Sequence, residues 1–585
     1  MIRNLMRYGS LAGVLVGLAA CDLDVSNPND PGTAEVLATP ADAEALLGSY
    51  YKRWHAGMYS SSINVDGMAA VQSFENYSSL ANSCQNQRGP IPRPANNNSI
   101  GNSCSGEQSR VYFIQGEVAR VASNILNQLN DPAFALGSAA RKLRAQAFAE
   151  FLRGLSHGYV ALTYDQGAVM TAGLAGDDPG VLVPYTEVMD AALVAFDNAI
   201  AHATASAAVT GVSDGFPIPT DWYPTTSTMD VPTFIRVVRS YKARFGANVA
   251  RTPAERATPP LTGYGWPEII ADATNGITAD HNNIMSTTGG PLNAWVGLWA
   301  GAGLWHQMPP FIIGMADQSG AYAAWSSVPL DSRGNVGSFF MVTADLRFPQ
   351  GATRLAQQTD FNRTTCDAPS TRCKRYYVNR PSGSDQTTGS AWGISNYDYV
   401  METRSWNLSG ASTARNGPLV FIRKAEMDLL AAEGHIRAGN YPAAATLINN
   451  TRTAGMVAGV ARGGGLAPVT GAANGGAALA TGGDCIPLVP VNVGINGGTT
   501  ACAGDLAGDR GIFEAMKYEK RLETQFSHFA AWFLDSRGWG DLPNGTPLYW
   551  AVPFQDLQAR QAAIYDSPGT GGIAGSAQVN STYGW

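Results

Sequence analysis

Four glutamates in two pairs are the residues of this 585-residue chain best spaced for acid–base chemistry. Glu426 and Glu433 lie seven positions apart, and Glu519 and Glu523 lie four apart. Two carboxylates on either side of a glycosidic bond are what a glycoside hydrolase requires. On a helix, however, each pair would share one face, where ion pairs with basic residues are the plainer explanation. Three arginines of these segments are candidate partners: Arg423, Arg452 and Arg521. The pattern therefore favours structural ion pairs over a glycosidase site.

Other catalytic and cofactor motifs are weak or absent in the sequence. Residues 211–215 match the Gly-x-Ser-x-Gly pattern of a nucleophile elbow, but they follow the Ala-rich end of a predicted helix. No strand precedes this pattern and no helix follows it, so we do not assign a nucleophile. The sequence contains no HExxH, Walker or GxGxxG motif, and its seven histidines lack metal-ligand spacing. His157 and His435 are expected to be packing or surface residues. We predict no enzyme activity, no cofactor and no metal site.

Aromatic residues in loops are the candidate ligand contacts. Sugar rings stack their C–H faces on tryptophan and tyrosine, and binding pockets combine such apolar surfaces with a few placed polar groups. The candidates are Tyr77, Trp295, Trp299, Trp305, Tyr322, Trp325 and Trp392, with Tyr397 beside the last. Trp295 and Trp299 would share one face of a helix, so core packing accounts for them equally well. Anchoring of a loop is the alternative for the others.

Six of the seven cysteines form three close pairs along the chain. The pairs are Cys84 with Cys104, Cys366 with Cys373, and Cys485 with Cys502, each in a Gly-, Asn- or Pro-rich stretch. An oxidising compartment favours disulfides in such loops, and closing a loop of about 15–20 residues restricts the unfolded chain by roughly 3 kcal/mol. Six cysteines allow 15 pairings, so proximity is the basis of this prediction. The competing zinc site lacks paired CxxC ligands.

Helices separated by long loops are expected to position these groups. Apolar residues recur at spacings of three and four over 41–59, 111–129, 143–162, 184–200, 231–251, 266–281, 422–436, 442–452 and 510–535. Gly439-Asn440 separates the predicted helices 422–436 and 442–452, which form an αα-hairpin. The sequence spacing between Ala432 and Ala444 is that of the small residues at which the two helices of a tetratricopeptide-type unit approach closely. Strict 34-residue repeats are not visible. The predicted fold is mainly α, with irregular loops and minor β.

The N-terminus predicts export and a lipid anchor. Arg3 and Arg7 precede an apolar run of ten residues, which is the pattern of a secretory signal rather than a spanning helix. The run ends in Leu18-Ala19-Ala20-Cys21, which resembles a bacterial lipoprotein signal with Cys21 as the acylated residue. Several acyl chains give stable anchoring. The alternative is an ordinary secreted protein with a chance cysteine. The proline-broken residues 22–31 are expected to form a tether.

Composition excludes several classes of protein. The net charge is −7 and the pI is near 5.6, which argues against a nucleic-acid binder with a basic surface. An apolar fraction of 45% rules out a wholly disordered chain. No run of 18 uncharged apolar residues occurs beyond the N-terminus, so a polytopic membrane protein is excluded.

The order of segments resembles the SusD/RagB family of outer-membrane nutrient-uptake lipoproteins. The similar segments are 21–29, 144–148, 151–153, 164–167, 184–193, 345–347, 422–434, 448–452, 519–523 and 551–557. There are departures from the family pattern. Leu346 replaces the proline of an Asp-Pro-Arg turn, Ala531 stands where a basic residue often precedes the tryptophan, and a long Gly/Ala insertion follows Val457.

The resemblance implies a non-catalytic lipoprotein on the outer membrane, facing outward. Such a protein is a lid on a SusC-like TonB-dependent transporter barrel, to which it delivers a glycan or peptide. Its helical core packs on the transporter, and loops on the opposite side form the ligand face. The implied division is 1–20 signal peptide, 21–38 lipidated tether, 39–281 N-terminal helical region, 282–418 loop-rich aromatic ligand-face region, and 419–585 C-terminal helical region. The alternatives are a secreted helical scaffold that binds only proteins or peptides and, with less support, a glycoside hydrolase.

Overall fold

The computed structural model describes residues 39–61, 63–76, 82–91, 93–174, 178–211, 214–291, 308–329, 332–333, 339–361, 374–379, 396–400, 416–479, 485–491, 497–569 and 577–585. Helices make up most of the regular structure in these ranges, and the strands occur only as two-stranded ribbons. The predicted mainly α class is confirmed. None of the helices in these ranges is long and apolar enough to cross a membrane.

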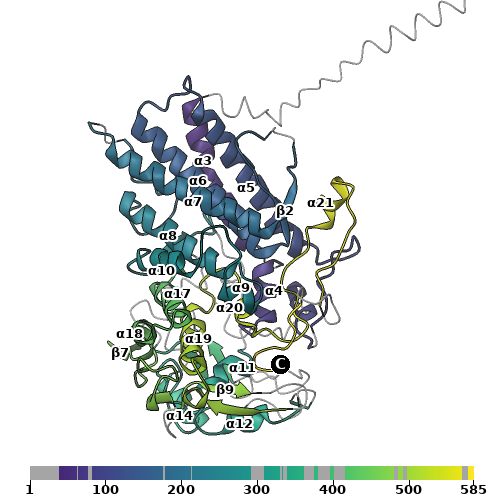
Figure 1. The fold of residues 1–585 in the computed structure, drawn as a ribbon, viewed down its shortest axis with the longest axis vertical. Helices are drawn as coiled ribbons and strands as arrows, with labels where there is room; N and C mark the ends of the chain where they lie inside the picture. Colours follow the sequence, from purple (N-terminus) through teal and green to yellow (C-terminus); the bar gives the residue numbers. More distant parts are fainter. Residues whose placement is uncertain are drawn as a thin grey trace, which may run out of the picture.

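Five long helices form the N-terminal half of the fold, in the upper part of Figure 1. They are α3 (Pro40–Tyr59), α5 (Gly106–Asn130), α6 (Ala139–Thr163), α7 (Tyr185–Ala208) and α8 (Val231–Asn248). Thr39 begins α3 with a capping box, in which its hydroxyl accepts from the Asp42 amide at 3.3 Å. Gly158 lets α6 and α8 approach closely, because a Cβ there would lie 2.0 Å from the Phe245 ring.

The C-terminal half contains the predicted αα-hairpin. Its two helices, α17 (Lys424–Arg437) and α18 (Tyr441–Arg452), are joined at Gly439, whose φ of +71° suits glycine. α10 (Trp266–Thr274) and α19 (Arg510–Thr524) pack on α17. The shorter helices are α4 (Val65–Gln72), α9 (Pro253–Ala257), α11 (Pro310–Ile313), α12 (Ala321–Ser326), α14 (Arg354–Asp360), α20 (Ala531–Trp539) and α21 (Phe554–Ala559).

The helix predicted over 510–535 is wrong, because the chain turns between α19 and α20. Phe526 and Ala530 both have positive φ values, near 51°. Two buried carboxylates hold this turn. Glu75 accepts from the Phe526 amide at 2.7 Å, and Asp66 of α4 accepts from the Ala530 amide at 2.7 Å. These contacts join residues more than 450 positions apart in the sequence.

Antiparallel ribbons connect distant segments. They pair β1 (Gln166–Ala168) with β2 (Leu182–Pro184), β3 (His281–Met285) with β6 (Gly417–Ile422), β4 (Tyr377–Asn379) with β5 (Tyr397–Tyr399), β7 (Met456–Val457) with β8 (Val460–Ala461), and β9 (Leu488–Val491) with β10 (Thr499–Cys502). In the β3–β6 ribbon, Asn283 lies opposite Leu419. This ribbon joins the end of the N-terminal half to the start of α17.

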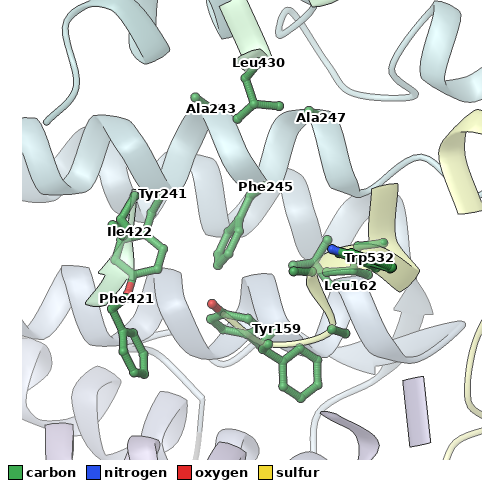
Figure 2. Close-up of a cluster of buried hydrophobic side chains, with 14 of the residues drawn as sticks. Tyr159, Leu162, Tyr241, Ala243, Phe245, Ala247, Phe421, Ile422, Leu430 and Trp532 are labelled. Carbon is green, nitrogen blue, oxygen red and sulfur yellow. The ribbon is translucent and has the colours of Figure 1, made fainter. Parts of the chain in front are cut away.

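One hydrophobic cluster runs through both halves. Figure 2 shows Phe245 of α8 pointing toward Tyr159 of α6, in a cluster that includes Phe421 of β6 and Trp532 of α20. The Tyr159 and Phe245 rings meet edge to face with centroids 5.0 Å apart. The halves therefore share a core.

Two of the three predicted disulfides are confirmed. Cys84 is bonded to Cys104 and Cys485 to Cys502, with Cα atoms 6.0 and 5.3 Å apart. Cys366 and Cys373 lie outside the described residues, as does Cys21.

Candidate ligand-binding site

Tyr322 and Trp325, two of the predicted ligand contacts, are core residues. They lie on one face of α12 and are 1% and 2% exposed. Their rings stack with centroids 6.0 Å apart, and Trp325 meets Phe311 edge to face at 5.1 Å. The Tyr322 hydroxyl donates to the Phe311 carbonyl at 2.6 Å. Neither ring presents a face to a ligand, so the packing alternative replaces ligand contact for both, as it does for the buried Tyr397.

The remaining aromatic candidates lie outside the described residues. They are Tyr77, Trp295, Trp299, Trp305 and Trp392.

The described residues next to three of these candidates are linked to one another through Gln525 and Met308. The Gln525 side-chain amide donates to the Glu75 carbonyl at 3.1 Å and contacts Met308 Sδ at 2.8 Å. The Met308 amide in turn donates to the Tyr397 carbonyl at 3.2 Å. Glu75, Met308 and Tyr397 are two, three and five positions from Tyr77, Trp305 and Trp392. The described residues that flank these three aromatics therefore lie close together in the core.

Glu426 and Glu433 are buried in ion pairs with distant arginines. Glu426 binds Arg244 of α8 through two bonds of 2.6 and 2.7 Å, and Glu433 binds Arg256 of α9 at 2.7 and 2.9 Å. Burial raises the pKa of Glu426, but the charge of Arg244 outweighs it and lowers the pKa to about 2. Arg256 lowers the pKa of Glu433 in the same way. Both carboxylates are ionised, and their burial leaves them inaccessible to a substrate.

Glu519 and Glu523 belong to a buried network around Arg347. The guanidinium contacts Glu519 at 2.7 Å and Glu523 at 3.3 Å, and it binds Asp345 at 2.7 Å. The Tyr518 hydroxyl donates to Asp345 at 2.7 Å. Burial lowers the pKa of Arg347, but the surrounding carboxylates raise it well above its usual value. The network is structural, because each side chain of these ion pairs is at most 2% exposed.

The prediction of structural ion pairs is therefore confirmed, but the predicted partners are mostly wrong. Arg423 pairs with Asp280 at 3.3 Å, Arg521 pairs with Asp541, and Arg452 approaches Glu519 only to 3.9 Å. The sequence shows that these charges lie on helices, but not which helices will face each other.

Two histidines on helices, His157 and His435, were predicted to be packing or surface residues. His157 is buried, its Nε2 accepts from the Met170 amide at 2.9 Å, and burial lowers its pKa to about 3. His435 is half-buried on α17. Within the described ranges, no three His, Cys, Asp or Glu side chains are grouped to hold a metal ion. Ser213 of the nucleophile-elbow pattern lies outside those ranges.

A pocket that the sequence did not predict lies beside α5. Its volume is about 200 Å³, and it is lined by α5, Val160 of α6, the β1–β2 ribbon with its connecting loop, and α21 with the residue that follows it. Figure 1 labels α5, β2 and α21 in its upper part. α5 contributes Phe113, Gly116, Glu117 and Arg120. These residues are spaced three, four and seven positions along the helix, so they share one face. The sequence shows this spacing, but it does not show that α21 lies opposite this face of α5.

The charged groups at this pocket are held by protein partners. Arg560, the residue after α21, binds Asp556 of that helix at 2.7 Å and donates to the Pro179 carbonyl at 2.8 Å. Asp556 also accepts from the Tyr112 hydroxyl at 3.0 Å. On the other side, Glu117 binds Arg53 of α3 at 2.5 Å.

Comparison with known proteins gives matches only among solved structures. No protein-family model and no curated protein sequence matches the chain. The chain is similar to a SusD-like carbohydrate binding protein from Bacteroides vulgatus, with a TM-score of 0.45, 12% identity and coverage of 87% of this chain and 86% of that one. It is similar to a SusD superfamily protein from Parabacteroides distasonis, with a TM-score of 0.46, 12% identity, and coverage of 89% of this chain and 97% of that one. It is also similar to a SusD/RagB family protein from Bacteroides thetaiotaomicron, with a TM-score of 0.43, 10% identity, and coverage of 85% of this chain and 87% of that one.

Proposed function

We propose that this protein is a SusD/RagB-type lipoprotein that captures a nutrient, preferentially an oligosaccharide, and delivers it to a TonB-dependent transporter barrel. One observation carries the proposal. Three separate segments that resemble the family, 345–347, 448–452 and 519–523, meet in the Arg347 network, where Thr451 also donates to Glu519 at 3.1 Å. Segments that match in order along the chain thus form one structural unit.

Binding without turnover is the second part of the proposal. The four glutamates that could have formed a glycosidase pair are buried, and Arg244, Arg256 and Arg347 neutralise Glu426, Glu433 and Glu519. A general acid needs access to the bond that it cleaves. These carboxylates have none, which supports capture over hydrolysis.

The ligand face is proposed to lie where the segments bearing Tyr77, Trp305 and Trp392 leave the core. Support comes from their described neighbours Glu75, Met308 and Tyr397, which are linked through Gln525 and Met308. The region 282–418, with Trp295 and Trp299, is proposed to supply most of this face. The opposite, helical side is proposed to pack on the transporter.

Removing the Trp305 ring tests the ligand face. We expect Trp305→Ala to abolish retardation of the protein in affinity gels that contain a bound polysaccharide, because the stacking area of the indole ring is lost. The melting temperature should match that of the wild type. Retention by wild type and Trp305→Ala alike would contradict the proposed ligand face, and protein binding without glycan or peptide retention would favour the scaffold alternative.

Removing the acylated cysteine tests the anchor. We expect Cys21→Ala to move the protein from the membrane pellet to the soluble fraction, since the acyl chains supply the membrane affinity. Ultracentrifugation followed by immunoblotting measures the distribution, and Cys366→Ala is the matched control. Full membrane retention of Cys21→Ala would refute a lipid anchor, and failure of the wild type to co-purify with a barrel protein would refute transporter delivery.

A further inference from the structure

We propose that Lys517 and Asp541 join through an intramolecular amide bond, which the protein forms by itself with Glu514 as the proton carrier. A nucleophile, a carboxyl carbon and a base meet there in one buried cluster, where α19 lies beside the residues that follow α20. None of the three side chains lines the pocket beside α5. The bond does not depend on the proposed capture function.

Lys517 is held between two carboxylates. Its Nζ lies 2.8 Å from Glu514 Oε1, one turn back along α19, and 3.1 and 2.9 Å from Asp541 Oδ1 and Oδ2. Contact with both oxygens of Asp541 places the nitrogen against the carbon between them. An amine acts as a nucleophile when an adjacent base within hydrogen-bond reach takes its proton. The lysine therefore has both an electrophilic carbon and a base at contact distance.

Water is excluded from this cluster, because each of the three side chains is 1% exposed. The lysine Nζ also faces aromatic rings, with centroids at 4.6 Å for Tyr583, 5.6 Å for Phe513 and 5.9 Å for Trp539. Keeping charged groups in such surroundings is costly. An amide replaces two charges with one neutral group, and the exclusion of water opposes hydrolysis of the bond once it has formed.

The reaction balances without any other reagent. Glu514 takes one proton from the Lys517 ammonium, and the freed lone pair attacks Asp541 Cγ to form the C–N bond. Glu514 returns that proton to Oδ1, a second proton passes from the nitrogen to the same oxygen, and the C–Oδ1 bond breaks with release of one water. Arg521 donates to Oδ2, the oxygen that stays in the amide, and so stabilises its negative charge while the carbon is tetrahedral.

The charges that remain after the reaction are already paired. Arg521 Nη1 donates to the Tyr583 hydroxyl at 3.0 Å, and that hydroxyl donates to Glu514 Oε2 at 2.6 Å. Loss of the Lys517 and Asp541 charges thus leaves one cation and one anion linked through a single hydroxyl. The bond spans 24 positions and ties α19 to the end of α20, across the turn between the two helices.

Tryptic digestion of the reduced, denatured full chain tests the bond directly, because trypsin does not cleave after a lysine whose amine is acylated. We expect one branched peptide, 511–520 joined to 538–560, which is lighter than the sum of the two by one water. Fragment ions in the mass spectrum should place the branch at Lys517 and Asp541. Separate peptides 511–517 and 538–560 from the wild type would mean a permanent ion pair and would overturn the proposal.

Two comparisons test the role of Glu514. Glu514→Gln keeps the shape of the side chain but cannot carry the proton, so we expect the joined fraction of freshly made protein to fall roughly tenfold or more. Lys520 is the matched control in the same digest, because it is equally buried and lies 2.8 Å from Asp535, its one ion-pair partner among the described residues.

Lys520 and Asp535 should stay unjoined, since no second carboxylate serves Lys520 as a base. Joining of this pair in the same yield as Lys517 and Asp541, or complete joining in Glu514→Gln, would overturn the role given to Glu514. If Glu514→Gln does not fold, the wild-type digest still decides whether the bond exists, and the Lys520 comparison decides whether proximity alone forms it.

Discussion

Replacing Arg347 with methionine is expected to lower the free energy of unfolding by about 3–5 kcal/mol or more. The substitution keeps most of the side-chain volume but removes the charge that faces Asp345, Glu519 and Glu523. All of these groups are almost fully excluded from water. Uncompensated carboxylates in such a place must either stay ionised at high cost or take up protons. Burial already raises the pKa of Glu519 even with Arg347 present.

Urea unfolding followed by circular dichroism would measure this loss. The control is Arg53→Met, which removes an equivalent charge from Glu117 at the surface, where the two side chains are 45% and 39% exposed. An exposed pair of this kind contributes at most about 1 kcal/mol. Equal losses in the two variants would show that the Arg347 network is not a major source of stability.

Stability is expected to fall as the pH rises from about 5 to 8, because of Asp66 and Glu75. Burial raises the pKa of Asp66 to about 7 and that of Glu75 to about 8. Between its ordinary pKa and the raised one, each group binds a proton in the folded state but not in the unfolded state. The slope of the unfolding free energy with pH is therefore negative in this window. The loss approaches roughly 4 kcal/mol for each group above its folded pKa.

The variants Asp66→Asn and Glu75→Gln isolate this effect. Each keeps an oxygen that can accept from the amide of Ala530 or Phe526 but no longer titrates. We expect the difference in unfolding free energy between variant and wild type to grow in favour of the variant from pH 5 to pH 8. Buried histidines act in the opposite direction at lower pH, since burial lowers the pKa values of His55 and His157 to about 3. A difference that is constant with pH would contradict raised pKa values for these two acids.

Local signals explain which helices could be predicted. Gly439, Asn440 and Pro442 lie within four residues and set the hairpin turn between α17 and α18, so the sequence contains the information needed. The break between α19 and α20 has no such signal, because Phe526 and Ala530 rarely adopt positive φ values. The carboxylates that hold these residues in place come from the other end of the chain. Tertiary contacts override the local preference there.

The candidate site was less predictable from the sequence than the helices were, because tertiary contacts decide which of its residues are buried. Tyr322 and Trp325 lie near turn-forming residues, which suggested a loop, but they share one face of α12 and that face is buried. The pocket beside α5 requires α21 to lie opposite Phe113, and more than 440 residues separate Tyr112 from its partner Asp556. Patterns within one helix cannot specify a partner that far away.

The turn between α19 and α20 also has a consequence for how the protein is made. Its hydrogen bonds to Glu75 and Asp66 span 451 and 464 positions, so they cannot form until nearly the whole polypeptide has been synthesised. Chains dominated by such distant pairings fold slowly. The α19–α20 turn therefore stays open while the chain is being made, and for the exported lipoprotein proposed above this is compatible with passage through a secretion channel, which requires an unfolded chain. The same delay leaves apolar surfaces uncovered, which exposes the unfinished chain to aggregation.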